Sequence, residues 1–130
     1  MADDAPLAPQ KSKNGLQRIS KALGYSVQGL RAAVRHEAAF RQELLLVTPL
    51  AIAAPFVARG AWELVALWGV LVALLVVELL NSALEALADA ISIEHHPLLG
   101  RAKDLGSAAV LLTLLFGALV WGVALGRLLG

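Results

Sequence analysis

The chain has 130 residues, of which 58% are hydrophobic and only 16% are charged, and its mean hydropathy is +0.72. Soluble domains are about 45 to 50% apolar and about 25% charged, so this composition excludes a soluble globular enzyme. The length fits a single domain, and the absence of cysteine excludes disulfides, thiolate nucleophiles and cysteine-ligated zinc. The net charge is only +1, yet seven of the eleven Lys and Arg residues fall between Lys11 and Arg41.

The N-terminal part of the chain predicts a leader followed by a surface helix. Residues 1–14 are rich in Ala, Pro and Asp without apolar periodicity, and no apolar signal-peptide core follows them, so we expect a disordered leader. From residue 15 to about residue 38, apolar residues recur at three- and four-residue steps and basic residues occupy the other face. This pattern favours an amphipathic helix in the membrane interface, and a surface helix of a soluble bundle is the alternative.

Three apolar segments follow, at about residues 40–59, 62–91 and 104–127, and each reaches or exceeds the roughly 20 residues that cross a bilayer. Pro49 and Pro55 predict kinks in the first. A polar loop containing Arg101 and Lys103 separates the last two. The predicted fold is an all-α membrane protein with an N-terminal amphipathic surface helix plus three transmembrane helices, and residues 15–130 form its single domain.

The distribution of basic residues predicts the orientation. The N-terminal segment and the loop with Arg101 and Lys103 are the basic ends, and three spans place both on one side of the membrane. Lys and Arg of short loops stay in the cytoplasm, so we expect a cytoplasmic N-terminus. Arg59 and Arg127 fall on the opposite side, but they are fewer than the basic residues of the first side, so the expected orientation does not change.

The second span carries an acidic stripe. At 100° per residue, Glu78, Glu85 and Asp89 lie within about 20° of one line along the helix, and Asn81 and Ser82 lie one turn along the same stripe. An ionisable residue in a span costs roughly 2.5 to 3.5 kcal/mol on insertion scales. The stripe must therefore face protein, water or a metal ion.

Three interpretations of this stripe remain open. A structural polar ladder between helices would account for Glu78, and so would an ion or proton pathway. Neither requires the further carboxylates Glu37 and Glu43 at the junction of the amphipathic helix with the first span, or the Lys103-Asp104 pair that opens the third. Carboxylates that converge at one membrane face suit Mg²⁺ with substrate phosphates, so a nucleotide-dependent phosphotransfer site fits best.

Three ordered motifs carry a specific resemblance. They are EAAFRQE at 37–43, VELLNSALEA at 77–86 and GRAKDLGSAAV at 100–110. Together they resemble the prokaryotic integral-membrane diacylglycerol kinase family, over the chain from about Ile19 to its C-terminus. The resemblance implies a homotrimer that phosphorylates diacylglycerol with Mg²⁺ and ATP, at sites shared between subunits on the cytoplasmic face of a bacterial inner membrane.

The resemblance also implies roles for single residues. Glu78 would be the catalytic base with Asn81 as its support, and Glu37 and Glu85 would hold the metal. The residues implied for nucleotide binding are Arg18, Tyr25, Glu37, Glu85, Glu94, His95, His96, Lys103 and Asp104. Those implied for lipid binding are Arg18, Arg31, Arg41, Glu43, Glu78 and Ser107.

Two positions depart from the family pattern, and other functions remain as alternatives. Val27-Gln28 stands where the family usually has an aromatic and then a basic residue, and His95-His96 stands where it has a Tyr-His pair. These departures bear on how the surface helix is anchored and how the base is stacked. Within the family, an undecaprenol kinase is the alternative to a diacylglycerol kinase. From other classes, a small ion or proton transporter and a structural membrane subunit are the alternatives.

Overall fold

The computed structural model describes residues 14–130, which form the helices α1 (Gly15–His36), α2 (Ala38–Val57), α3 (Ala61–Ile91) and α4 (Pro97–Leu129). The predicted leader lies outside the described residues except for Asn14. Helix α1 belongs to one compact unit, and the residues from Glu37 to Gly130 form a second.

Helix α1 is amphipathic, as its sequence predicts. The side chain of Asn14 caps its start, because Asn14 Oδ1 accepts a hydrogen bond from the backbone N–H of Gln17 at 2.9 Å. Large apolar side chains such as Leu16, Leu23 and Leu30 are exposed along one face. The helix ends at His36, and the extended backbone of Glu37 (φ −110°, ψ 105°) separates it from α2.

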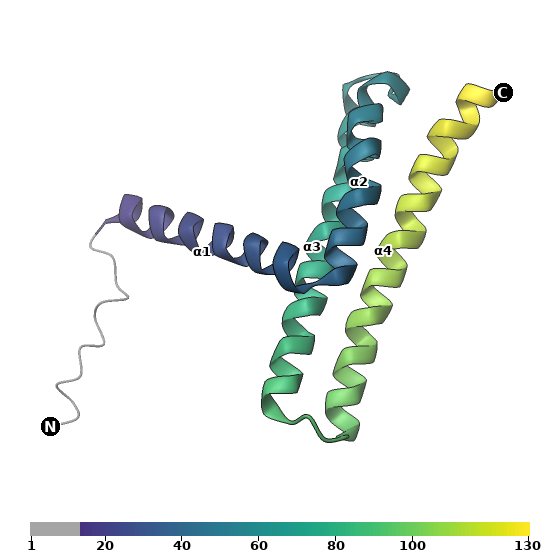
Figure 1. The fold of residues 1–130 in the computed structure, drawn as a ribbon. Helices are drawn as coiled ribbons and strands as arrows, with labels where there is room; N and C mark the ends of the chain where they lie inside the picture. Colours follow the sequence, from purple (N-terminus) through teal and green to yellow (C-terminus); the bar gives the residue numbers. More distant parts are fainter. Residues whose placement is uncertain (1–13) are drawn as a thin grey trace, which may run out of the picture. The chain divides into compact units, whose positions relative to one another are not determined.

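The helices α2, α3 and α4 are long and apolar enough to cross a membrane, so the predicted count of three spans is confirmed. Figure 1 shows them side by side, with α2 and α4 each along α3. Helix α2 runs from residue 38 to 57 rather than from 40 to 59, and α4 begins at Pro97 rather than at residue 104. The early start of α4 has a local cause. His96 Nδ1 accepts a hydrogen bond from Leu98 N at 3.2 Å, and Pro97 follows in the first turn, where its missing N–H costs nothing.

The apolar core of this unit lies along α3. Leu67 is fully buried, and Leu71 and Leu74 continue its face one and two turns further on. Residues from the neighbouring helices complete the core, namely Val47, Ala54 and Val57 of α2 and Trp121 and Ala124 of α4. The core therefore fixes α3 between its two partners, and the polar stripe of α3 continues from it toward the α3–α4 turn.

A tryptophan compensates for a proline in α2. Pro55 has no N–H, so it cannot donate the helical hydrogen bond to the carbonyl oxygen of Ala51, four residues earlier. The indole Nε1 of Trp68, on α3, donates to that oxygen at 2.9 Å. Because the bilayer core supplies no water to satisfy backbone groups, this bond both repairs α2 and ties it to α3.

An arginine joins all three helices at the end opposite the α3–α4 turn. Arg127 Nη1, in the last turn of α4, donates to Glu63 Oε2 in the first turn of α3 at 2.8 Å, and Nη2 contacts Glu63 Oε1. Nη2 also donates to the carbonyl oxygen of Val57 at 3.1 Å, which is one of the last carbonyls of α2 and has no partner within that helix. The charge of Arg127 therefore stabilises this end of the bundle.

Candidate active site

Four carboxylates gather where α2 begins alongside α3. Glu37 is the N-cap residue of α2 and Glu43 lies on its second turn, while Glu78 and Glu85 lie two turns apart on α3. We call Glu37, Glu43, Glu78 and Glu85 the acidic cluster. It combines two segments that are distant in the sequence, because α2 packs against α3 and brings Glu43 to the level of Glu78.

Glu78 is the innermost member of the acidic cluster. Its side chain is buried, with a relative exposure of 4%. The hydroxyl of Ser82, one turn later, lies 3.5 Å from Glu78 Oε1, and the carboxyl group of Glu43 lies within hydrogen-bonding reach of Glu78. Glu37 and Glu85 are close enough to Glu78 to act on it electrostatically. Glu78 is therefore a buried acid surrounded by like charges.

Two buried oxygen atoms beside Glu78 have no hydrogen-bond partner. They are Glu43 Oε1 and Asn81 Oδ1. A buried acceptor left without a donor costs about 1 to 3 kcal/mol, so native proteins rarely keep one without a reason. Both atoms accept and neither donates when the carboxyl group of Glu43 is ionised. The site is therefore suited to a ligand that brings a hydroxyl group or a cation.

A lysine of α4 lies beside the part of the α3 stripe that is nearer the α3–α4 turn. Lys103 Nζ, on α4, forms an ion pair with Asp89 Oδ1 of α3 at 2.6 Å. Both side chains are partly exposed, at 41% for Lys103 and 57% for Asp89. Glu85 lies close enough to act electrostatically on both Glu78 and Lys103. The stripe thus leads from a buried carboxylate to a solvent-accessible lysine.

The lengths of the helices determine which part of the stripe lies beside α2 and which part extends past it. Helix α2 has 20 residues, so it is about 30 Å long and matches the thickness of the hydrocarbon layer. Helices α3 and α4 have 31 and 33 residues, and Figure 1 shows that they continue past the start of α2. From Glu78 to the end of α3 at Ile91 the helix rises by about 20 Å. Glu78 therefore lies level with the start of α2, and Lys103, the partner of Asp89, lies nearer the α3–α4 turn.

The predicted metal ligands fit the chemistry of Mg²⁺ without forming a complete cage. Within residues 14–130, no three His, Asp or Glu side chains lie close enough together to hold a metal ion by themselves. Mg²⁺ usually takes one or two carboxylates from the protein and completes its shell with phosphates and water. The side chain of Glu37 makes no capping bond to α2. It and Glu85, which is part-exposed, supply oxygen atoms of the required kind.

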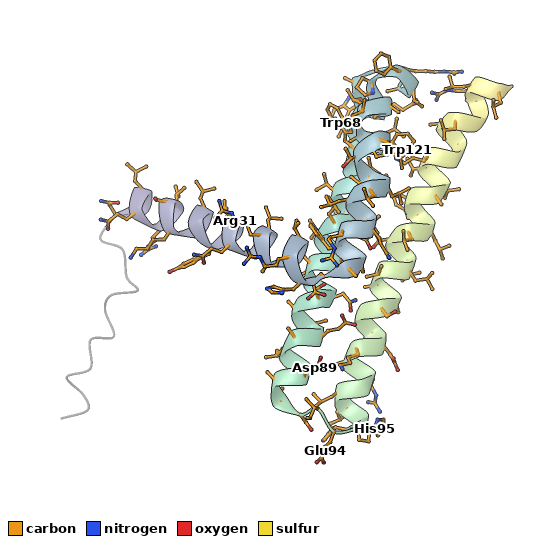
Figure 2. The ribbon with its side chains drawn as sticks, viewed as in Figure 1. Arg31, Trp68, Asp89, Glu94, His95 and Trp121 are labelled. Carbon is orange, nitrogen blue, oxygen red and sulfur yellow. The ribbon has the colours of Figure 1, made fainter. Side chains whose placement is uncertain are left out.

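The structure brings together some of the residues implied by the resemblance. Glu43, Glu78, Asn81 and Glu85 meet at the acidic cluster, and Lys103 follows along the stripe. Figure 2 shows Glu94 and His95 at the α3–α4 turn, with Asp89 above them on α3. The predicted residues whose side chains are exposed are Arg18, Tyr25 and Arg31 on α1, Arg41 on α2, and Asp104 and Ser107 on α4. The roles of all these residues stay predictions.

Two residues with a place in the site were missing from the predicted set. Asp89 was recognised only as part of the stripe, yet it is the partner of Lys103. Asp89 and Lys103 lie equally far along the chain from His96, and an antiparallel hairpin brings such residues to the same level, so the pairing was accessible to sequence reasoning. Gly106 packs directly against the side chain of Asn81. No periodicity distinguishes Gly106 from the other glycines of α4.

Comparison with known proteins shows the family of the chain. The family model described as "Prokaryotic diacylglycerol kinase" matches residues 24–125. A protein of Escherichia coli strain K12 named "Diacylglycerol kinase" is 46% identical over 111 residues, which cover 85% of this chain and 91% of that protein. A Pseudomonas aeruginosa protein of the same name is 44% identical over 118 residues, covering 91% of this chain and 96% of that protein. A Haemophilus influenzae protein of the same name is 39% identical over 108 residues, covering 83% of this chain and 92% of that protein. The chain belongs to the prokaryotic diacylglycerol kinase family.

Proposed function

We propose that this chain transfers the γ-phosphoryl group of ATP to the primary hydroxyl group of diacylglycerol, with Glu78 as the general base. The family and the names of its relatives favour this reaction over the transporter, the structural subunit and the undecaprenol kinase. The observation that carries the assignment of the site is the burial of Glu78 beside two unpartnered acceptors, Glu43 Oε1 and Asn81 Oδ1.

The reaction asks for a proton acceptor at the lipid head group. The hydroxyl oxygen of diacylglycerol attacks the γ-phosphorus, the bond from that phosphorus to the β–γ bridging oxygen breaks, and ADP leaves. The proton of the hydroxyl group passes to the carboxylate of Glu78, which yields phosphatidic acid. General-base help of this kind is worth about 10² to 10⁴ in rate. The level of Glu78 on α3 suits a hydroxyl group that lies at the membrane surface.

The remaining polar residues hold the substrates and their charge. Glu37 and Glu85 would hold Mg²⁺, which supplies neutralisation of the phosphate charge when bound. Lys103 would turn from Asp89 toward the transferring phosphoryl oxygens, since phosphoryl transfer depends mainly on positioning and electrostatics. Asn81 would hold the reacting hydroxyl group beside Glu78 by donating a side-chain Nδ2–H to the hydroxyl oxygen, which leaves the single hydroxyl proton directed at Glu78.

The site is proposed to be shared between the subunits of a homotrimer. Lys103 faces α3 of its own chain, whereas Asp104 and Ser107, which follow it on α4, are exposed. Three helices of one chain cannot enclose ATP, a lipid head group and several carboxylates, because ligand sites in bundles form between facing helices. A closed ring repeats one interface and so creates one equivalent site per chain. The inner membrane of a bacterium, with a cytoplasmic N-terminus, would then place every site where ATP is available.

A single substitution tests the catalytic assignment. Glu78→Gln keeps the volume of the side chain and removes the base, so turnover with ATP and diacylglycerol should fall by about 10² or more while assembly in detergent persists. Glu63→Gln is the matched control, because it makes the same change on the same helix at the opposite end of the bundle. Near-normal turnover of assembled Glu78→Gln protein would reject Glu78 as the base. Parallel assays with undecaprenol distinguish the two lipid classes.

Mixing inactive chains tests the shared site. Glu78→Gln chains and Asp104→Asn chains are unfolded, combined at an equal ratio and reassembled. If Glu78 comes from one subunit and Asp104 from its neighbour, random assortment leaves about a quarter of the sites intact, so about a quarter of the wild-type activity should return. A well-assembled mixture without activity would contradict a shared site, and the kinase assignment would stand.

A further inference from the structure

We propose that Gly106 is a positioning residue of the site, because its missing side chain leaves the space in which the amide group of Asn81 stands beside Glu78. This inference rests on the proposed function, in which Asn81 supports the base. It adds a residue of α4 to the machinery of the reaction.

The contact between Gly106 and Asn81 is the closest of its kind in the described part of the chain. A Cβ atom added to Gly106 would overlap Asn81 Oδ1, would lie 3.2 Å from Asn81 Cγ and would lie 3.4 Å from Leu84 Cδ1. At the other described glycines an added Cβ meets nothing closer than 3.7 Å. The recess at Gly106 therefore has two walls, and both belong to side chains of α3.

The nature of the overlapped atom decides what an alanine would do. Asn81 Oδ1 is the far end of a flexible side chain, and it is buried without a hydrogen-bond partner that would resist its rotation. The three atoms nearest to an added Cβ all belong to side chains of α3. Alanine also favours the helix more than glycine does. An alanine at 106 should therefore rotate the amide group of Asn81 and leave the packing of α3 and α4 in place.

The position of Asn81 makes that rotation costly for the reaction. Asn81 lies one turn from Glu78 on the same stripe, so their side chains are neighbours on the helix surface. Gly106 lies one turn beyond Lys103, so the recess and the lysine belong to the same side of α4. A group that is misplaced by about 1 Å in an active site costs on the order of 10²-fold in rate. Gly106 thus controls turnover through Asn81.

The competing explanation is that Gly106 only lets two helices pack closely. That explanation predicts that alanine destabilises the protein whatever residue stands at 81. Positioning predicts instead that the effect of alanine depends on Asn81. A double-mutant cycle separates the two, because residues that act through one another give non-additive effects.

The experiment compares Gly106→Ala, Asn81→Ala and the double variant as assembled full-length protein with MgATP and diacylglycerol. Gly106→Ala should lower kcat on the order of 10²-fold, with an unchanged KM for MgATP and an unchanged melting temperature. In the Asn81→Ala background the same substitution should lower kcat no further. Gly117→Ala is the matched control, because its Cβ would meet Val70 Cβ of α3 at 3.9 Å, which is an ordinary contact.

Each other outcome is decisive. Wild-type kcat in Gly106→Ala would overturn the proposal, and so would an equal loss of kcat with and without Asn81. If Gly106→Ala fails to assemble, an assembled double variant supports the proposal, and a double variant that also fails overturns it.

A spectroscopic measurement keeps the proposal separate from the function. The chain has two asparagines, Asn14 and Asn81. Selective ¹⁵N labelling of asparagine should therefore show one side-chain amide shifting in Gly106→Ala and none in Gly117→Ala, with Asn14 as the internal reference. An unshifted Asn81 amide would overturn the proposal. If wild-type protein does not phosphorylate diacylglycerol, the proposed function fails, and the amide shift still decides whether Gly106 positions Asn81.

Discussion

The bond from Trp68 to α2 allows a quantitative prediction about stability. Trp68→Phe keeps an aromatic ring and removes the Nε1 donor that reaches the carbonyl oxygen of Ala51 at 2.9 Å. Because Pro55 supplies no N–H, that oxygen is then left without a donor. An acceptor left unpaired away from water costs about 1 to 3 kcal/mol, and hydrogen bonds between membrane helices average about 0.6 kcal/mol with a maximum near 1.7. We expect a loss of about 1 kcal/mol in the free energy of unfolding.

The same logic predicts that the loss depends on Pro55. Pro55→Ala restores an N–H to α2, and this N–H can donate to the Ala51 oxygen within the helix. In the Pro55→Ala background, Trp68→Phe should therefore cost less than half of what it costs in the wild type. Equilibrium unfolding in mixed micelles measures the free energy of unfolding of the wild type, the two single variants and the double variant. Trp62→Phe, at an 85% exposed position, is the control for the loss of an indole group. Equal costs of Trp68→Phe in both backgrounds would refute the reasoning.

Three further predictions concern the metal, the cap and the arginine at the end of the bundle. Glu37→Gln and Glu85→Gln should each raise the Mg²⁺ concentration for half-maximal activity, because phosphates and water still fill most of the shell; an unchanged Mg²⁺ dependence in both would remove them as ligands. His96→Ala should destabilise the start of α4 by about 1 kcal/mol, seen as faster exchange of the Leu98 amide, and His96→Asn should restore protection. Arg127→Met should lower the melting temperature while the turnover of assembled protein stays at the wild-type level; reduced turnover would mean that this end of the bundle takes part in the reaction.

Hydrophobic periodicity was sufficient to predict the spans and the acidic stripe. The three spans follow from long apolar runs, and the alignment of Glu78 with Glu85 follows from the helical repeat. The start of α4 could not be predicted, because Arg101, Lys103 and Asp104 suggest a loop whereas they lie on a helix that continues past the apolar layer. Amino-acid composition signals whether a segment is apolar, and it does not signal whether a polar segment is helical.

Contacts between helices were the second limit of sequence reasoning. The repair of α2 by Trp68, the ion pair of Lys103 with Asp89 and the recess at Gly106 each join residues on different helices. The helical repeat predicts which residues share a face, but the partner of each face depends on the level at which the helices cross. The antiparallel turn at His96 is the one place where the sequence predicts which residues of two helices lie at the same level. This prediction covers only the residues nearest to the turn.

The two ends of the bundle leave different buried polar groups without a partner, the donor Arg127 Nε at one end and two acceptors at the other, and this difference suits a catalytic membrane protein. Away from the α3–α4 turn, Arg127 and Trp68 donate to backbone carbonyls that the helices leave unpaired. At the acidic cluster, the buried acceptors Glu43 Oε1 and Asn81 Oδ1 have no donor. Each such acceptor lowers stability by about 1 to 3 kcal/mol until a ligand supplies the hydrogen bond. A bound substrate regains that free energy, so the protein is stabilised by contacts at one end while polar groups at the other stay available for the reaction.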